Sequence, residues 1–261
     1  MANHAPVDYI QISPNRGNTI KGVRYYNRLA DVTRITPHHA AGVLSVKNML
    51  DWFSKESTQA SCTYVVGNDG KRGLCCEENV RPWTSSSKDN DNSAITVEVV
   101  NSATGGKWPV SDAAFDSLVD LCIDVCKRYG KKRLLWIPDK DTALAYKLKA
   151  DEMLLTQHRW FANTNCPGEY LGSKFPELAA RVTAALQGDE IDMTKDEVIK
   201  LIDKRIDEKL KGENTKPSGW AEKELAEAVA LGITDGERPQ GYATRQETAI
   251  MVKRGMKKEG A

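Results

Sequence analysis

The sequence predicts an α/β fold with a mixed central β-sheet flanked by helices, followed by a linker helix and a small helical C-terminal unit. Short runs rich in β-branched residues alternate with longer segments whose apolar residues recur every three to four positions. Strands separated by helices favour a sheet that is covered on both faces. A change of composition after Leu186 predicts the parts that follow the sheet.

Strand-like runs and helical patterns alternate along the first part of the chain. The expected strands are residues 33–37, 62–66, 73–76, 94–100 and 133–137. The expected helices are residues 43–55, 112–129, 142–149 and 175–186. The sequence Asn68-Asp69-Gly70 is a hairpin signal, and it joins the second run to the third.

The chain after residue 187 is expected to form a linker and a small unit. Thr194 and Glu197 have the spacing of a capping box that opens a helix over about residues 195–211. An apolar stripe between 198 and 210 predicts that this helix packs on a second copy of the chain or on the first domain. We therefore expect a domain over 1–187, a helical linker over 188–217 and a helical unit over 218–261.

The last part is expected to be two helices joined by a loop. Thr244 and Glu247 form a second capping box before the second helix. The first helix is expected to end at Gly232 and to bury four apolar side chains: Trp220, Leu225, Val229 and Leu231. A unit of roughly 40 residues is near the lower limit for independent folding, so we expect it to pack on the linker or on a partner copy.

Composition excludes several classes of partner. The 261 residues include 37 Lys and Arg against 36 Asp and Glu. The net charge is therefore close to zero and does not favour binding to nucleic acid or to an anionic membrane. We also expect no membrane insertion, because the sequence has no apolar run of about 18 residues. The N-terminal residues lack the basic and apolar segments of a signal peptide, which predicts a protein made in the cytoplasm without one.

Two short segments combine histidine with cysteine at the spacing of a metal site. His38 and His39 lie in one segment, and His158 lies in the other with Cys166 shortly after it. Two imidazoles and one thiolate can hold Zn²⁺ and leave its fourth position open for water, as hydrolytic zinc sites do. Successive side chains of a strand alternate, so only one of the adjacent histidines is expected to face the metal. Four other cysteines, Cys75, Cys76, Cys122 and Cys126, are expected to be small buried residues.

Glu98 and Thr164 could turn a bound metal into a catalyst. Glu98 lies in an apolar strand run, where it either faces solvent or acts as a general base beside the metal. Thr164, two residues before Cys166, either serves a turn or donates a hydrogen bond to the oxyanion of a tetrahedral intermediate.

Aromatic residues could line a substrate cleft beside these groups. Trp83 lies in a polar loop, and it either anchors the loop or stacks on a sugar. Trp160 is close to His158 in the sequence and could line the same cleft, and His39 could contact substrate or pack behind the metal.

Four segments carry a resemblance to a known family: ITPHHAAG, ASCTYVVGNDGKRGL, ENVRPWTSSSKDNDNSAITVEVVN and LTQHRWFANTNCPGEYL. In order and spacing they resemble the zinc-dependent N-acetylmuramoyl-L-alanine amidases, which are related to peptidoglycan recognition proteins and phage lysozyme-type amidases. The resemblance covers residues 1–187 and is greatest to endolysins from phages or prophages of Gram-positive anaerobes. It implies cleavage of the bond between N-acetylmuramic acid and L-alanine in peptidoglycan. It also implies that the protein reaches the cell wall after release by a holin or when it is added from outside.

The resemblance also implies a role for each matching residue. It makes His38, His158 and Cys166 the zinc ligands, Glu98 the activating carboxylate and Thr164 the oxyanion donor. One segment departs from the family, which often has a Tyr or small residue followed by His or Asn where this chain has Cys62 and Thr63. No catalytic role is assigned to that strand.

The C-terminal sequence GWAEKELAEAVALGITDGERPQGYATRQETAIMVKR resembles a single S-layer-homology-type repeat. Such repeats occur in sets and bind secondary cell-wall polymers, so the resemblance implies a wall-binding unit. A homo-oligomer formed through the 198–210 stripe would bring several copies together.

Two other classes of function remain open at this point. A peptidoglycan-binding module without activity would lack the cysteine ligand, whereas Cys166 is present. A cysteine hydrolase would use Cys166 as nucleophile and His158 as base. Tightly bound zinc would argue against this second alternative.

Overall fold

The computed structural model describes residues 4–188, 199–200, 202–203, 206, 216–237, 239 and 243–258. The chain divides into two compact units, Met1–Ile191 and Asp192–Ala261. Much of the predicted linker lies outside the described residues, so its boundaries at 187 and 217 stay predictions. No helix in the described part of the chain is long and apolar enough to cross a membrane.

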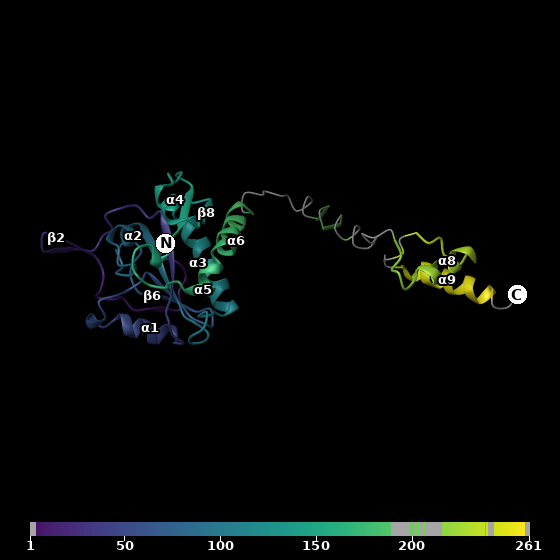
Figure 1. Ribbon diagram of the computed structural model, residues 1–261, viewed down its shortest axis with the longest axis horizontal. Helices are drawn as coiled ribbons and strands as arrows, with labels where there is room; N and C mark the ends of the chain where they lie inside the picture. Colours follow the sequence, from purple (N-terminus) through teal and green to yellow (C-terminus); the bar gives the residue numbers. More distant parts are fainter. Residues whose placement is uncertain are drawn as a thin grey trace. The chain divides into compact units, whose positions relative to one another are not determined.

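A seven-stranded sheet forms the centre of the first unit (Figure 1) and confirms the predicted fold class. The strand order is β1-β6-β5-β7-β4-β9-β8. Within the described sheet, β5 and β6 pair antiparallel across the predicted Asn-Asp-Gly turn, and the other neighbours pair in parallel. The strands are β1 (Tyr9–Ile10), β4 (Arg34–His39), β5 (Tyr64–Val66), β6 (Arg72–Leu74), β7 (Ala94–Val99), β8 (Arg133–Leu135) and β9 (Glu152–Leu155).

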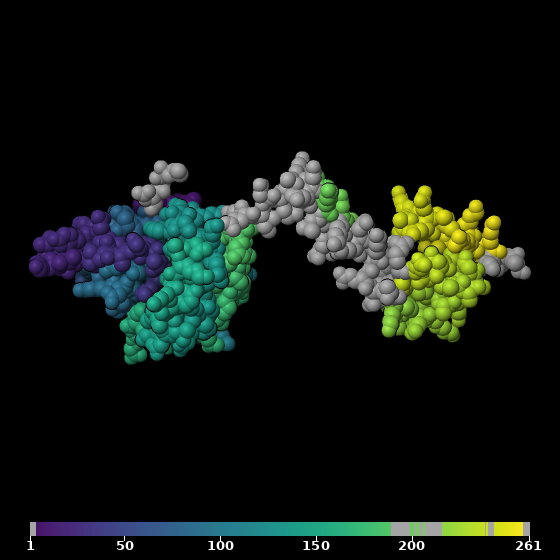
Figure 2. All heavy atoms as spheres, turned by 90° about the horizontal axis from the view of Figure 1, so that it is seen from above, coloured from purple at the N-terminus to yellow at the C-terminus, as the bar shows by residue number. Residues whose placement is uncertain are grey.

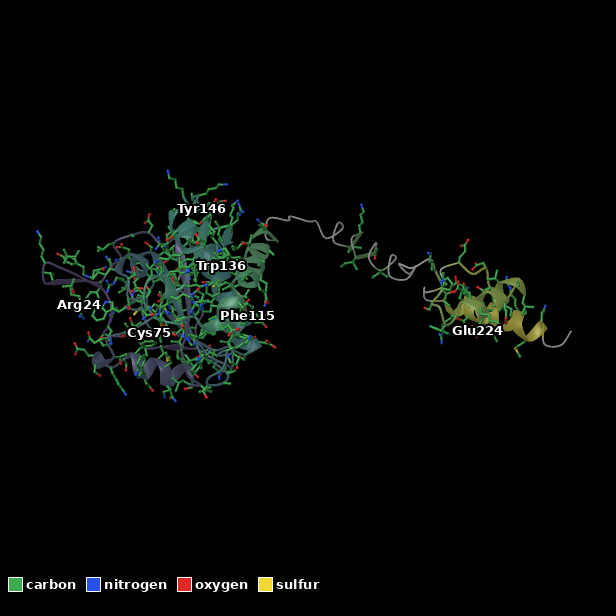
Figure 3. The ribbon with its side chains drawn as sticks, viewed as in Figure 1. Arg24, Cys75, Phe115, Trp136, Tyr146 and Glu224 are labelled. Carbon is green, nitrogen blue, oxygen red and sulfur yellow. The ribbon has the colours of Figure 1, made fainter. Side chains whose placement is uncertain are left out.

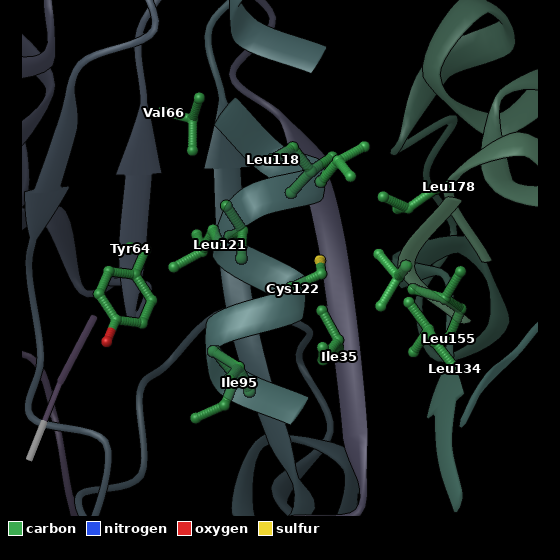
Figure 4. Packing of buried hydrophobic residues seen from close by; sticks show 14 of the residues in the cluster. Ile35, Tyr64, Val66, Ile95, Leu118, Leu121, Cys122, Leu134, Leu155 and Leu178 are labelled. Atoms are coloured by element: carbon green, nitrogen blue, oxygen red, sulfur yellow. The ribbon is translucent and has the colours of Figure 1, made fainter. Parts of the chain in front are cut away.

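Helices cover both faces of this sheet, as predicted. The helices are α1 (Val46–Phe53), α2 (Lys88–Ser93), α3 (Asp112–Arg128), α4 (Lys140–Ala145), α5 (Gly168–Ser173) and α6 (Phe175–Gly188), with short 3-10 turns η1 (Glu56–Thr58) and η2 (His158–Trp160). α3 and α6 pack on the face that presents Ile35 and Ile95, and Figure 4 shows Leu118, Leu121 and Cys122 of α3 in this core. α1 packs on the opposite face.

A two-stranded hairpin lies outside the main sheet. β2 (Asn18–Ile20) pairs antiparallel with β3 (Val23–Tyr25). Lys21 and Gly22 between them have φ of 48° and 79°, as both central residues of a type I′ turn do. Lys-Gly is not one of the residue pairs that commonly form this turn, so the hairpin was not predicted from the sequence.

The helix expected over 142–149 is wrong in its bounds, because α4 begins and ends earlier. The Asp139 side chain accepts a hydrogen bond from the Thr142 backbone N–H at 2.8 Å, which caps the helix N-terminus before Lys140. The following segment instead leads into β9, which was not expected to be a strand. Glu152 is buried there, where it pairs with Arg133 at 3.5 Å, so its carboxylate is compensated.

The loop expected over 81–93 contains α2, a helix whose sequence KDNDNS has no apolar periodicity. Ser87 caps it by accepting a hydrogen bond from the Asn90 N–H at 3.3 Å. Because its inward residues are polar, hydrophobic periodicity could not reveal it. The six cysteines are all free and buried.

The second unit contains α8 (Glu222–Ala230) and α9 (Arg245–Lys258). The Thr244–Glu247 capping box is confirmed by its two reciprocal hydrogen bonds of 2.7 and 3.2 Å, and Gly232 ends α8 with φ of 67°. The expected burial is wrong for three of the four side chains, since Trp220 is 85% exposed, Leu231 48% and Val229 40%, whereas Leu225 is partly buried. Two helices bury only the side chains that lie between them, so apolar side chains on their outer sides remain exposed.

The linker helix is described at five positions only. Ile199, Ile202 and Ile206 are helical, and each exposes about half of its surface: 44%, 50% and 49%. The capping box at Thr194 and the rest of the 198–210 stripe lie outside the described residues.

Gly73 lets α1 approach the sheet. A Cβ atom at Gly73 would lie 2.7 Å from Val46 Cγ1 and 2.8 Å from Leu50 Cδ1, and both neighbours are buried. We predict that Gly73→Ala lowers the free energy of unfolding by about 1–3 kcal/mol, because the packed helix cannot yield. Urea denaturation checks this, with Gly42→Ala as control, where the nearest atom is 3.8 Å away. Equal stabilities would contradict the packing argument.

Candidate functional site

The register of β4 on β7 places the first pair of polar site residues. The two parallel strands align His38 with Glu98, so both side chains leave the same face of the sheet near its carboxyl edge. His38 is buried, and its Nδ1 atom lies 4.0 Å from Glu98 Oε1. His39 points to the opposite face, as the alternation of side chains predicts.

The chain returns to this edge after β9 and brings two further groups. η2 begins at His158, and the loop that follows carries Cys166. The ligand atoms of His38, His158 and Cys166 lie within 4.8 Å of one another. Cys166 Sγ lies 3.3 Å from His38 Nδ1, and the two imidazole centroids are 4.8 Å apart. The structure thus brings together the three residues that the sequence analysis selected as metal ligands.

The state of these side chains fits a metal ion. The Nε2 atoms of His38 and His158 are buried and have no hydrogen-bond partner among the described residues. Burial lowers the pKa of both histidines, which keeps the imidazoles neutral and their lone pairs available. Burial raises the pKa of the Cys166 thiol, so its thiolate needs a cation beside it. Two neutral imidazoles and one thiolate suit zinc.

A gap in the sheet makes room for the cysteine. β9 pairs with β4 only at Arg34 and Ile35, and its last hydrogen bond runs from Thr156 N to Ile35 O at 3.0 Å. Pro37, the next residue facing that side, has no N–H to offer a longer strand. The backbone N–H of His39 lies against the Cys166 sulfur instead. Burial raises the pKa of the Cys166 thiol, and this hydrogen bond opposes part of that rise.

Glu98 does not lie on a solvated face, because its side chain is only 13% exposed. Burial raises the pKa of Glu98 to about 8 in the protein without metal. Its Oε2 atom is buried and has no hydrogen-bond partner among the described residues. A carboxylate with an unused oxygen beside three candidate metal ligands can act as a general base.

A comparison with known protein families finds one that matches the part of the chain carrying these residues. The N-acetylmuramoyl-L-alanine amidase family matches residues 28–169, which is more than half of the 261-residue chain and includes all three ligands and Glu98. The chain belongs to this family. It is therefore an amidase of peptidoglycan.

Several solved structures are similar to the amidase at low sequence identity. PlyL is 13% identical, with a TM-score of 0.46, and the match covers 68% of this chain and 97% of that one. The N-acetylmuramoyl-L-alanine amidase LysC from Clostridium intestinale URNW is also 13% identical, with a TM-score of 0.42 and coverage of 66% and 96%. The peptidoglycan recognition protein SD of Drosophila is 15% identical, with a TM-score of 0.40 and coverage of 59% and 86%. No curated protein sequence matches the chain.

Thr164 braces the loop of the amidase that carries Cys166. Its Oγ1 atom accepts a hydrogen bond from the Cys166 N–H at 3.2 Å, which is the turn role considered from the sequence. The hydroxyl hydrogen remains available to donate. The oxyanion role of Thr164 therefore stays a prediction that this geometry permits.

The aromatic residues proposed as cleft walls have structural contacts. Trp160 is only 8% exposed and stacks on Trp136 at 5.6 Å, so little of its surface is available to a substrate. Its packing holds η2, and thereby His158, against the sheet. The edge of the His39 ring meets Trp108 at 5.6 Å on the side of the sheet away from His38. A substrate role for either residue stays untested, and their positions favour packing.

Trp83 anchors its loop. The indole N–H donates to the Gly17 carbonyl at 2.8 Å, and the guanidinium groups of Arg24 and Arg81 lie 5.3 and 6.0 Å from its ring. These cations lie against the ring that could otherwise stack on a sugar, so of the two alternatives considered the loop anchor is favoured.

Sequence analysis missed two groups that support the ligands. Asn90 of α2 donates to Thr36 Oγ1 at 3.0 Å, and Thr36 bonds Thr156 at 2.7 Å, so a buried polar network lies one side-chain step below His38. Arg159 ties η2 to the cysteine loop, since its N–H donates to Cys166 O at 3.1 Å and its Nη2 to Gly168 O at 2.9 Å. Neither group lies in a recognisable metal-ligand spacing, although Arg159 directly follows a ligand.

Proposed function

We propose that this amidase is a zinc-dependent endolysin that hydrolyses the amide bond between N-acetylmuramic acid and L-alanine in Gram-positive cell walls. The observation that carries the proposal is the convergence of His38, His158 and Cys166 within 4.8 Å, beside the buried carboxylate of Glu98. Three protein ligands leave a fourth coordination position for water or substrate, which is the arrangement of hydrolytic zinc sites.

His38, His158 and Cys166 would hold the ion through two neutral nitrogens and one thiolate sulfur. Zinc in this position supplies a Lewis acid and lowers the pKa of a bound water to about 7. The protein contributes the fixed geometry: β4 positions His38, the stacked Trp160 positions η2, and Arg159 holds the cysteine loop. Such preorganisation spares the reaction the cost of ordering these groups.

Glu98 acts as the general base and then as the general acid. Its carboxylate accepts a proton from the water that attacks the amide carbonyl, and it returns that proton to the departing nitrogen of L-alanine. The Thr164 hydroxyl donates a hydrogen bond to the carbonyl oxygen as negative charge develops there. The proton taken from water thus protonates the leaving amine, and no further acid is needed.

The proposal extends to the parts beyond the catalytic unit. The resemblance of residues 218–261 to an S-layer-homology-type repeat supports binding to a secondary cell-wall polymer. The half-exposed Ile199, Ile202 and Ile206 support a homo-oligomer through the linker helix, which would gather several such repeats. The protein would be made in the cytoplasm and act on the wall after release by a holin or from outside.

Product analysis tests the proposed bond. We expect digestion of purified Gram-positive peptidoglycan to generate new N-terminal alanine without new reducing sugars. New reducing ends would indicate glycoside cleavage, and new N-termini other than alanine would indicate cleavage within the peptide. Wall binding without any product would support the alternative of a binding module.

Loss of one ligand should separate metal binding from folding. We predict that the purified protein holds one zinc per chain and that Cys166→Ser loses most of it, because a neutral hydroxyl is a poor zinc ligand. Cys122→Ala is the matched control, since Cys122 is another buried cysteine but lies in the hydrophobic core. Elemental analysis measures both. A wild-type protein that hydrolyses peptidoglycan without zinc would favour the cysteine-hydrolase alternative.

Glu98→Gln should keep the metal and lose turnover. The amide cannot accept a proton from water, so we expect kcat to fall by about 100- to 10,000-fold at unchanged zinc content. Glu169→Gln is the control, because Glu169 is 67% exposed and pairs with Lys107 at the surface. A Glu98→Gln variant with native turnover would show that Glu98 has only a structural role.

A further inference from the structure

The β2–β3 hairpin projects from the first unit. Figure 1 shows β2 away from the main sheet, and Figure 2 shows the N-terminal segment, in purple, at one end of the unit. Residues 19–27 are all exposed, on both faces of the ribbon. The tip of the hairpin is therefore open to solvent.

The base of the hairpin is nevertheless firmly held. Asn18 is buried and exchanges two hydrogen bonds with Asn92 of α2, at 3.0 and 3.2 Å. Arg28 donates to the backbone carbonyls of Glu78 and Asp91. The ribbon thus rests on the same α2 segment whose Asn90 supports the strand of His38. A rigid mounting of this kind lowers the entropic cost of binding a partner at the tip.

The exposed groups of the hairpin have one charge sign and an aromatic character. Residues 9–30 include no acidic residue. Lys21 and Arg24 pair with no described carboxylate, and Tyr25 and Tyr26 are 49% and 48% exposed. Figure 3 labels Arg24, whose guanidinium lies 5.3 Å from the Trp83 ring centroid. Three further exposed side chains are aliphatic, namely Ile20, Val23 and Leu29, and Thr19 and Asn27 are exposed and polar.

We propose that this hairpin is a second binding surface for polymeric peptidoglycan, distinct from the metal centre. Tyr25 offers apolar ring surface to sugar rings, whereas the Tyr26 ring already has the Arg16 guanidinium 5.1 Å from its centroid. Lys21 and Arg24 offer charge to the carboxylates of the peptide stems. Charge complementarity favours this occupant, because the polymer combines sugars with regularly spaced acidic groups. Pairing of the hairpin with the hairpin of a second copy is disfavoured, since the two would carry the same charge and repel. The inference rests on peptidoglycan being the substrate of the amidase.

The test separates polymer binding from hydrolysis. The full chain with Glu98→Gln is sedimented with purified peptidoglycan freed of secondary wall polymers, so that binding is measured without turnover. Adding Arg24→Gln and Tyr25→Ser should raise the dissociation constant by about tenfold, and the remaining binding should depend less on salt. Zinc content should stay unchanged and the unfolding temperature should fall little, because Tyr25 and Arg24 are exposed and the Arg24 hydrogen bond to the Pro14 carbonyl lies at the surface.

A matched control removes one exposed cation and one exposed tyrosine elsewhere in the same unit. Lys140→Gln with Tyr9→Ser serves this purpose, and it should bind like the parent protein. Equal binding by the hairpin variant and this control would overturn the inference. So would hairpin-dependent self-association in sedimentation velocity, or hairpin-dependent binding to single-stranded RNA as tight as to peptidoglycan.

Failure of the proposed function gives a different result. If the native chain releases no new N-terminal alanine while hairpin variants still lose wall binding, the hairpin inference holds and the catalytic proposal fails. If the native chain cleaves the wall while the hairpin variant binds like the control, the hairpin inference alone fails.

Discussion

The parallel pairing of β4 with β7 is the constraint on which the site depends. This register aligns His38 with Glu98 and sets the histidine nitrogen 4.0 Å from the carboxylate. A shift of β4 by one residue against β7 would turn His38 to the α3 face, where the core is apolar, and would separate it from Glu98. Buried apolar residues on both strands fix the register, so the packing of the core and the position of the catalytic groups have the same cause.

The remaining ligands occupy a place that the sheet leaves free. β9 separates from β4 after Thr156, and Pro37 offers no N–H to extend the pairing. The chain can therefore turn through η2 and return with Cys166 against the exposed backbone of His39. Trp160 stacked on Trp136 and Arg159 bonded to the cysteine loop restrict this return path. The candidate metal ligands are thus held by one strand edge and one braced loop.

Buried polar residues of α2 hold neighbouring segments in place next to the site. Asn90 and Asn92 lie on a helix without apolar periodicity, yet one supports Thr36 under His38 and the other holds the base of the β2–β3 hairpin. Buried amides satisfy several partners at once, which fixes orientation more tightly than apolar contact does. The same short helix therefore connects the metal centre with the proposed polymer-binding surface.

The sequence by itself determined the elements and residues that follow from local rules. Hydrophobic periodicity located α1, α3, α6, β4 and β7, and capping boxes and turns located the start of α9 and the β5–β6 hairpin. Residue chemistry together with the family resemblance selected His38, His158, Cys166 and Glu98. It failed where distant partners decide the outcome. Glu152 can occupy a strand because Arg133 pairs with it, α2 forms because its asparagines find buried partners, and Trp160 faces the core because Trp136 is there. Those contacts join residues far apart in the chain or on separate elements, and only the tertiary structure brings them together.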